Sequence, residues 1–202
     1  MLSAKQADLF STDNPVPDIK VQGLNYIADY ISADDEQELL LEIDRHDWLS
    51  DLKRRVQHYG YKYDYKARAV DAKAYLGQMP AWISELCRKL TADKIFLVIP
   101  DQVIVNEYLP GQGISAHIDC VPCFGDTVAS LSLGSSCTME FSHSGTGDKK
   151  ELLLERGSLV VLSGPARYEW QHAIPARKSD VVDGVKIERK RRVSLTFRKV
   201  IL

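Results

Sequence analysis

The sequence predicts a mainly β protein with flanking helices, an α+β fold, and three observations lead to this prediction. Two segments with helical apolar spacing lie in the first half of the chain. From about residue 102 onward, short strand-like segments alternate with turns that contain glycine or proline. At 202 residues, of which 45% are hydrophobic and 27% charged, the chain has an ordinary globular composition and can bury a core without disulfides.

The first half of the chain is predicted to hold an extended entry segment and two helices. Residues 1–20 are polar and are expected to form a flexible tail, and residues 23–31 are expected to be extended. Ser32 and Asp35 have the form of a capping box, which predicts a helix that starts at Ser32. A second helix is predicted over residues 80–91, because its proline suits the first turn.

Six short strands are predicted in the second half of the chain. Their bounds are Gln102–Asn106, Thr127–Leu133, Thr138–Phe141, Glu151–Leu154, Ser158–Leu162 and Arg192–Val200. Strands of this length with regular turn signals predict an antiparallel sandwich or barrel with two sheets. No internal repeat or clear linker interrupts the pattern, so residues 21–202 are predicted to form one domain whose β core covers about residues 100–202.

The segment over about residues 52–75 combines basic residues with tyrosines. The tyrosines alternate with other residues at Tyr59, Tyr61, Tyr63 and Tyr65. A period of two predicts that all four side chains lie on one face of a strand. They could contact a planar ligand, or they could pack with their rings buried and their hydroxyl groups in water.

Three residues form a candidate metal site. His117 and Asp119 stand two apart after a glycine-rich turn, and in an extended segment their side chains share a side. His172 follows much later in the chain. Two imidazoles and one carboxylate make the facial triad of non-haem iron(II) oxygenases, which leaves positions open for a cosubstrate and O2. The His-x-Asp pair alone is weak evidence for a metal site, because such a pair is more often a surface histidine beside a loop aspartate.

A pair of arginines strengthens the metal hypothesis. Arg192 and Arg198 stand six apart on a predicted strand and therefore share one face. A dicarboxylate such as 2-oxoglutarate needs fixed cations, and guanidinium groups supply paired donors for a carboxylate. The alternative is that both arginines are solvent-facing charges, since Arg192 ends the basic run of residues 189–192.

These residues belong to a longer ordered pattern. It comprises Asn106-Glu-Tyr108, His117-Ile-Asp119, Ser130–Gly134, Ser163–Tyr168, His172 and Arg192–Arg198. In order and spacing this pattern resembles the AlkB-like dioxygenases over roughly residues 20 to 200. The resemblance implies that family's fold, a double-stranded β-helix or jelly roll, with an N-terminal helical and lid region.

The resemblance also implies an Fe(II)- and 2-oxoglutarate-dependent dioxygenase that consumes O2. By position in the pattern, Fe(II) is bound by His117, Asp119 and His172. The 2-oxoglutarate contacts implied are Arg192 at the distal carboxylate, Arg198 near the keto end, and hydrogen bonds from Asn106 and Tyr108. The cofactor supplies the oxidative chemistry, and the protein positions it.

Members of the family that repair nucleic acid remove N-methyl groups from 1-methyladenine and 3-methylcytosine in DNA or RNA. The resemblance therefore implies oxidative demethylation of alkylated bases, with the tyrosine-rich segment as a nucleotide-recognition lid. Candidate substrate contacts are Arg54 and Arg55 for phosphates and Tyr61 and Tyr63 for base stacking.

One departure from the repair members leaves the substrate open. They carry an acidic residue where this chain has Val121, and the lid and last strand look closer to a branch that hydroxylates a modified wobble uridine in tRNA. The alternative function is therefore hydroxylation of a tRNA nucleoside or a protein. A catalytically silent binding module is disfavoured by the complete triad and arginine pair.

Charge and cysteine content set the remaining expectations. The net charge of -2 means that nucleic acid would be bound by local basic patches. No apolar run suits a membrane span or a signal peptide, so we expect a cytoplasmic monomer that does not bind membranes. Cys120 and Cys123 form a C-x-x-C beside Asp119, and we expect an incidental thiol pair rather than a zinc site or a disulfide framework, with an oxidation-sensitive loop as the alternative.

Overall fold

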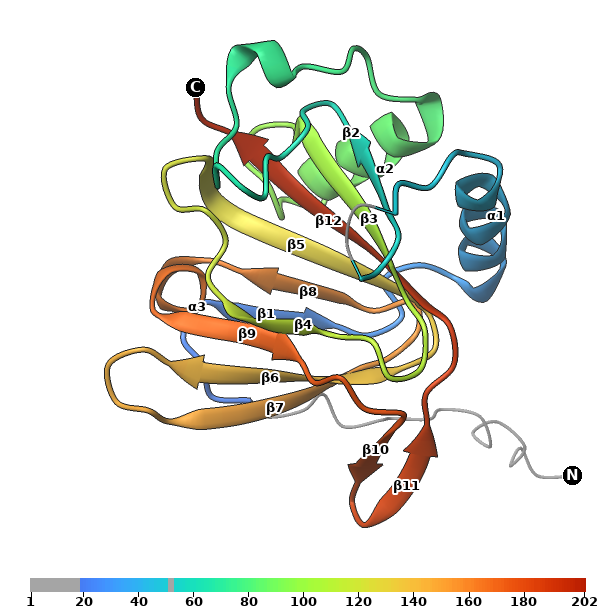
Figure 1. Ribbon diagram of the computed structural model, residues 1–202, viewed down its shortest axis with the longest axis vertical. Helices are drawn as coiled ribbons and strands as arrows, with labels where there is room; N and C mark the ends of the chain where they lie inside the picture. The colour runs from blue at the N-terminus through green and yellow to red at the C-terminus, as the bar shows by residue number, and fades with distance from the viewer. Residues whose placement is uncertain (1–18, 51–52) are drawn as a thin grey trace, which may run out of the picture.

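Two antiparallel β-sheets face each other in the computed structural model of the protein, which describes residues 19–50 and 53–202 (Figure 1). The larger sheet has the strand order β1 (Leu24–Ile27), β8 (Leu159–Leu162), β5 (Phe124–Gly134), β12 (Arg192–Val200), β3 (Gln102–Tyr108) and β2 (Val56–Tyr59). The smaller sheet has the order β4 (Ile114–His117), β9 (Trp170–Ile174), β6 (Cys137–His143) and β7 (Lys149–Leu154). This mainly β arrangement is the predicted jelly roll.

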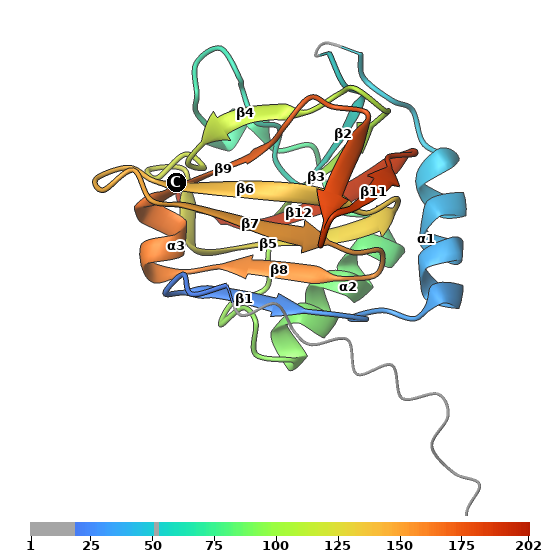
Figure 2. The same cartoon turned by 90° about the horizontal axis from the view of Figure 1, so that it is seen from below.

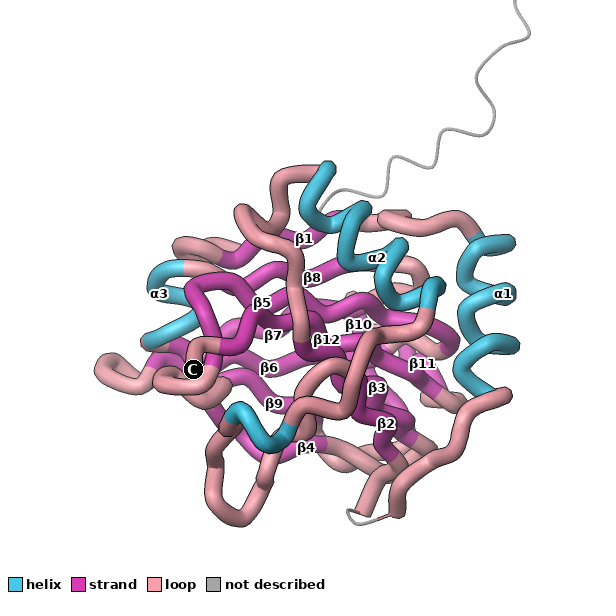
Figure 3. Tube along the Cα trace, turned by 90° about the horizontal axis from the view of Figure 1, so that it is seen from above, coloured by secondary structure: helices cyan, strands magenta, loops and turns pink. Residues whose placement is uncertain are grey.

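The helices lie outside the sheets. Helix α1 (Ala33–Asp44) has the predicted capping box, because the Ser32 side chain accepts from Asp35 and the Asp35 side chain accepts from Ser32. Helix α2 (Ala81–Ala92) begins one residue later than predicted, with Pro80 as its N-cap. Figures 2 and 3 show α1 beside the strand ends and α2 on the outer side of the larger sheet. A short helix α3 (Gly164–Tyr168) and a 3-10 turn η1 (Ala72–Ala74) complete the helical elements of the described residues.

The alternation of β12 shows how the larger sheet separates core from cavity. Val193, Leu195 and Phe197 are buried in one core cluster with residues of α1 and α2. The alternate residues of the strand line a cavity between the sheets; they are Arg192, Ser194, Thr196 and Arg198. A second core cluster, which includes Met139 and Phe141, lies beside this cavity, and some of its members, such as Met139, also line it. One face of the sheet thus stabilises the fold, and the other presents polar groups.

All six predicted strands are present, and Arg192–Val200 has the predicted bounds. The chain also forms two strands that carry histidines of the candidate metal site, β4 and β9, and a hairpin of β10 (Ser179–Val182) and β11 (Val185–Glu188) that stands away from the sheets (Figure 1). These short strands lack the apolar run or clear alternation on which the prediction depended.

The prediction of one tyrosine-bearing strand is wrong. Strand β2 ends at Tyr59, and Gly60 follows with a φ of +75°. A Cβ atom at Gly60 would stand 1.9 Å from the carbonyl oxygen of Asp101, so only glycine allows this close turn. Beyond it, Tyr61 makes an isolated bridge to Tyr75. The alternating tyrosines therefore do not lie on one face of a single β-strand.

Part of the predicted domain organisation lies outside the described residues. The expected tail over residues 1–20 is described only from residue 19, and the expected start of the lid at residue 52 is not described. Within the described part of the chain, no helix has the length and apolar character needed to cross a membrane.

Candidate functional site

A cavity of about 850 Å³ opens between the two sheets. Its floor is formed by side chains of β3, β5, β8 and β12 from the larger sheet and of β4, β6 and β9 from the smaller one. Its mouth is lined by two residues between α1 and β2, Lys53 and Arg54, and by three residues after β2, Tyr63, Tyr65 and Arg68. The cavity is therefore built from rigid strands at its base and from irregular chain at its entrance.

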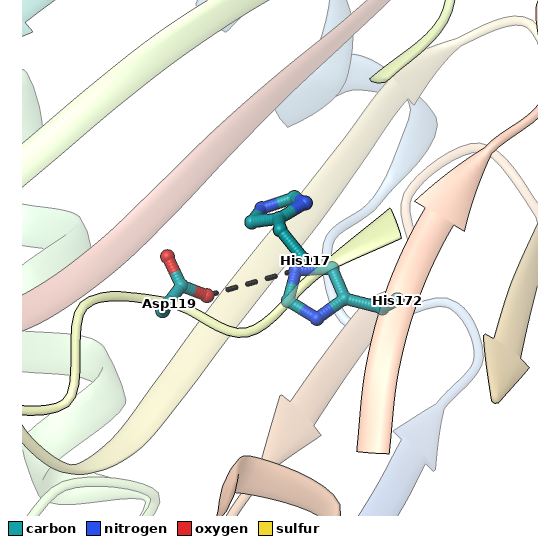
Figure 4. A group of neighbouring side chains, drawn as sticks. All are labelled: His117, Asp119 and His172. Atoms are coloured by element: carbon teal, nitrogen blue, oxygen red, sulfur yellow. Dashed lines mark ion pairs between the residues drawn. The ribbon is translucent and has the colours of Figure 1, made fainter. Parts of the chain in front are cut away.

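The three predicted metal ligands meet in this cavity (Figure 4). His117 ends β4 and stands opposite His172 of β9 in the antiparallel pairing, with 4.4 Å between their ring centroids. Asp119 follows two residues after β4, and its Oδ2 lies 3.6 Å from His172 Nε2. The ligand atoms of the three residues lie within 4.8 Å of one another, a spacing that one metal ion can bridge.

The triad has atoms free to bind a cation. Nδ1 of His117 lies 2.8 Å from the carbonyl oxygen of Ser115, so a proton on Nδ1 leaves the Nε2 lone pair available. Among the described residues, no donor hydrogen-bonds to the buried Oδ2 of Asp119. A buried carboxylate oxygen without a donor is costly unless a ligand compensates it, and a divalent cation fits this requirement.

Local charges favour the metal-binding protonation states. Burial alone would raise the pKa of Asp119, but the positive charge of Arg198, with His172 and His117, holds that pKa well below its usual range. Burial lowers the pKa of His172 to about 4, although Asp119 opposes this change. At neutral pH the site therefore presents a carboxylate and a neutral imidazole, as a metal ligand set requires.

Arg192 is poised for an anionic group. Its side chain is 2% exposed, and its Nη2 donates to Ser132 Oγ at 2.8 Å. Its Nε and Nη1 have no hydrogen-bond partner among the described residues. Tyr108 stands opposite Arg192 in the β3–β12 pairing, and the guanidinium lies 5.4 Å from the centroid of the tyrosine ring. Two unsatisfied donors on a buried guanidinium match the needs of a carboxylate.

The other residues predicted to bind the cosubstrate line the same cavity. Arg198 Nε donates to Asp119 Oδ1 at 2.9 Å, and its Nη1 donates to Gln102 Oε1 at 3.1 Å. Arg54 Nε donates to Asn106 Oδ1 at 2.9 Å. Arg198 thus orients the carboxylate of Asp119, a relation that sequence spacing did not reveal.

Arg167 has a place in the site that the sequence did not predict. Its side chain is 2% exposed, and its Nη1 donates to the carbonyl oxygen of Asp119 at 2.9 Å. Its Nη2 lies 3.3 Å from the carbonyl oxygen of Cys120. Arg167 belongs to the segment Ser163–Tyr168 of the ordered sequence pattern, but the sequence predicts no role for it. A sequence gives no sign that an arginine is buried against the backbone of a distant loop.

Only two of the four predicted substrate contacts lie at the cavity. Arg54 and Tyr63 line it, whereas Arg55 and Tyr61 do not. Arg55 Nε and Nη2 donate to the buried carboxylate of Glu107, at 2.6 and 2.7 Å, and this ion pair satisfies the buried charge. Tyr61 packs against other lid side chains and Cys120. Arg55 and Tyr61 therefore lie away from the cavity lining, whereas Tyr65 and Arg68, which the sequence did not single out as substrate contacts, lie at its mouth.

Comparisons with known proteins give consistent results. The sequence model of the 2OG-Fe(II) oxygenase superfamily matches residues 27–198. An uncharacterized protein of Acanthamoeba polyphaga mimivirus is 37% identical over 182 residues, 90% of this chain and 86% of the viral protein. An Arabidopsis thaliana protein named alkylated DNA repair protein ALKBH8 homolog is 39% identical over 206 residues, 91% of this chain and 60% of the plant protein.

A longer relative and two solved structures extend the comparison. Mus musculus tRNA (carboxymethyluridine(34)-5-O)-methyltransferase ALKBH8 is 37% identical over 205 residues, which cover 88% of this chain but 30% of the mouse protein. The structure of OsALKBH1 covers 88% of this chain and 96% of its own, with a TM-score of 0.68 and 17% identity. The structure of a Pseudomonas putida prolyl-4-hydroxylase covers 89% of this chain and 93% of its own, with a TM-score of 0.55 and 15% identity.

The structural matches show the jelly-roll fold, and the sequence matches show the family. The chain spans less than two thirds of the plant and mouse relatives, so their complete activities do not transfer with the family. Members of this family use Fe(II), 2-oxoglutarate and O2, and the donor set of the cavity fits these groups. The chain belongs to the 2OG-Fe(II) oxygenase superfamily and is an AlkB-like Fe(II)- and 2-oxoglutarate-dependent dioxygenase.

Proposed function

We propose that this enzyme hydroxylates a carbon–hydrogen bond of a modified nucleobase in RNA, with a tRNA uridine substituent as the first candidate. In this proposal His117, Asp119 and His172 hold Fe(II). Arg192 and Arg198 of β12 position 2-oxoglutarate with Asn106 and Tyr108 of β3, and the two strands lie side by side in Figure 1. When bound, iron and 2-oxoglutarate together activate O2, and hydroxylation of the substrate accompanies formation of succinate and CO2.

The charge of the cavity carries the proposal. Among the described residues that line it, Asp119 is the only acidic one. Its carboxylate accepts a hydrogen bond from Arg198 and, in this proposal, binds the metal. The entrance instead carries Lys53, Arg54 and Arg68. The cationic bases 1-methyladenine and 3-methylcytosine would favour a nearby carboxylate, whereas a neutral or anionic uridine derivative suits basic surroundings. Val121, exposed beside the site, adds no negative charge.

The entrance also has features suited to a nucleotide. Tyr63 and Tyr65 lie edge to face with 5.1 Å between ring centroids, and both line the cavity. Aromatic faces can stack on an extruded base, and lysine and arginine can contact its phosphates. The mouse relative is named for a reaction on carboxymethyluridine of tRNA, which supports RNA as the substrate of this similar domain.

Oxidative demethylation of N-alkylated bases in DNA or RNA remains the second candidate. Two more distant relatives favour it, the Caenorhabditis elegans DNA N6-methyl adenine demethylase at 27% identity and the Danio rerio probable RNA/DNA demethylase ALKBH6 at 28%. Hydroxylation of an N-methyl group gives a hemiaminal, which breaks down to formaldehyde and the unmodified base. The same iron and cosubstrate positions serve both reactions.

One experiment separates the two candidates. The Fe(II)-loaded enzyme is incubated with 2-oxoglutarate and two substrates: tRNA carrying 5-carboxymethyluridine-type wobble nucleosides, and oligonucleotides carrying 1-methyladenine or 3-methylcytosine. Nucleoside mass spectrometry is expected to show a gain of one oxygen on the uridine substituent. Loss of a methyl group with release of formaldehyde would instead support demethylation, and the absence of both products would reject both candidates.

A further inference from the structure

A pair of cysteines links the loop after Asp119 to the lid. Cys120 and Cys123 form a disulfide in the structure, across a tight turn in which Cys123 N donates to the carbonyl oxygen of Cys120 at 3.2 Å. Both residues belong to a small apolar cluster with Phe124 and with Tyr61 and Tyr63 of the lid. The expectation of an incidental thiol pair is therefore corrected, since the turn brings the two sulfur atoms together.

Both sulfur atoms face the same lid carbonyl group. Cys120 Sγ lies 3.2 Å and Cys123 Sγ lies 3.5 Å from the carbonyl oxygen of Arg68. A thiol can donate a hydrogen bond to this oxygen, but a disulfide has no hydrogen to donate. The contact is therefore a hydrogen bond only when the cysteines are reduced.

Arg68 is a residue whose backbone depends on such support. Its φ is +53°, in the left-handed region that residues other than glycine adopt only where the surroundings hold them. Its side chain lines the cavity mouth, and the carbonyl group of Asp64 bonds to Ala69 across the same loop. Loss of the thiol donor would remove a tertiary hydrogen bond from the strained residue of this loop.

We propose that Cys120 and Cys123 form a reversible oxidation site whose redox state controls how firmly the lid loop around Arg68 is held over the cavity. Cys120 lines the cavity and is half-buried, whereas Cys123 is 5% exposed, so a small oxidant reaches Cys120 first. The reduced pair holds the lid through a thiol hydrogen bond, and the disulfide lacks this bond, so that the lid stays in place but is held less firmly.

The oxidant assigned is hydrogen peroxide. Sγ of Cys120 attacks one peroxide oxygen, the O–O bond breaks, and one water leaves with the thiol proton, which gives a sulfenic acid. Sγ of Cys123 then attacks the Cys120 sulfur, the S–O bond breaks, and a second water leaves. Two thiols are oxidised by two electrons, one peroxide is reduced to two waters, and a dithiol reductant reverses the change.

The test uses the full-length protein loaded with Mn(II) and 2-oxoglutarate, because Mn(II) avoids the radical chemistry of Fe(II) with peroxide. Protein reduced with dithiothreitol is compared with the same protein after brief peroxide treatment. Intact mass and alkylation count the free thiols, and limited trypsin digestion measures cleavage after Lys62, Lys66 and Arg68, which lie in the described lid segment. Oxidation is expected to remove two thiols and to speed lid cleavage between about twofold and tenfold, the range for one net hydrogen bond.

Matched variants make the result specific. Cys120→Ser lacks the thiol that peroxide oxidises first and cannot form the disulfide, so its lid cleavage should not respond to peroxide. Cys123→Ser tests the second step, because its oxidation should stop at the sulfenic acid of Cys120, which intact mass detects as a gain of one oxygen without a disulfide. Cys137→Ser removes a buried free cysteine elsewhere and should respond as the wild type does. Failure of peroxide to form the disulfide, or equal lid cleavage in both redox states, would overturn the proposal. No nucleic acid enters these readouts, so they do not depend on the proposed substrate.

Discussion

The two ends of the cavity are built in different ways. At the base, Arg192 and Arg198 project from one nine-residue strand that is paired on both sides, and each is at most 9% exposed. At the entrance, Tyr65 and Arg68 lie on a loop held by turns, an isolated bridge and a few side-chain contacts, and both residues are exposed. Regular strand pairing therefore positions the residues at the base, whereas fewer contacts hold the loop at the entrance.

Removal of one histidine of the triad, at the bottom of the cavity, should have the largest effect on turnover. We expect His172→Ala to lower 2-oxoglutarate turnover by at least about a thousandfold, because two remaining ligands cannot hold the metal in a facial site. Succinate production and bound iron measure the effect. His143→Ala is the matched control, since His143 bonds to Glu169 outside the cavity lining and should keep wild-type turnover. Full activity in His172→Ala would show that the triad is assigned wrongly.

A change at Arg192 should act on the cosubstrate alone. We expect Arg192→Lys to raise the KM for 2-oxoglutarate by roughly 10- to 100-fold, because lysine cannot present the two donors that now lack partners, and a charged hydrogen bond contributes about 1.5–3 kcal/mol. Steady-state succinate assays give the KM. Lys186→Ala on the exposed hairpin should leave it unchanged. An unchanged KM in Arg192→Lys would assign 2-oxoglutarate to another cation.

Arg167 should have a smaller effect that passes through Asp119. We expect Arg167→Lys to weaken Mn(II) binding about tenfold, since residues that orient metal ligands typically contribute 10- to 100-fold to affinity. Metal titration and thermal unfolding are measured together. Ile43→Val, in the core behind the larger sheet, should lower the stability of the fold without lowering the affinity for Mn(II). If metal affinity in both variants simply follows their stability, Arg167 has no positioning role.

A substitution in the lid should not affect the binding of 2-oxoglutarate at the base of the cavity. We expect Tyr65→Ala to keep the KM for 2-oxoglutarate within about twofold of the wild type, while RNA affinity falls roughly 5- to 100-fold through loss of base stacking. Tyr75→Ala is the control, because Tyr75 is 54% exposed and does not line the cavity. Equal RNA affinity in the two variants would remove Tyr65 from the substrate site.

Much of the fold and of the cavity base could be predicted because local rules decide them. The capping box of Ser32 and Asp35 acts within one turn of helix, and the alternation of β12 follows from the pleat of a strand. The ordered pattern of His117, Asp119 and His172 likewise identified residues that the fold brings within 4.8 Å. In each case the relevant neighbours are near in sequence or fixed by regular pairing.

The sequence by itself thus predicted the β core, the three residues of the candidate metal site that meet in the cavity, and the two arginines that line it. Only the tertiary structure decided that Arg55 neutralises Glu107, that Arg167 holds the backbone of Asp119, and that Arg68 meets the cysteine turn. These contacts join residues 48 to 52 positions apart, and for Arg55 and Arg167 they satisfy a buried charge or a carbonyl group. Side-chain type and spacing carry no information about such long-range partners, because burial and partner geometry exist only once the chain has folded.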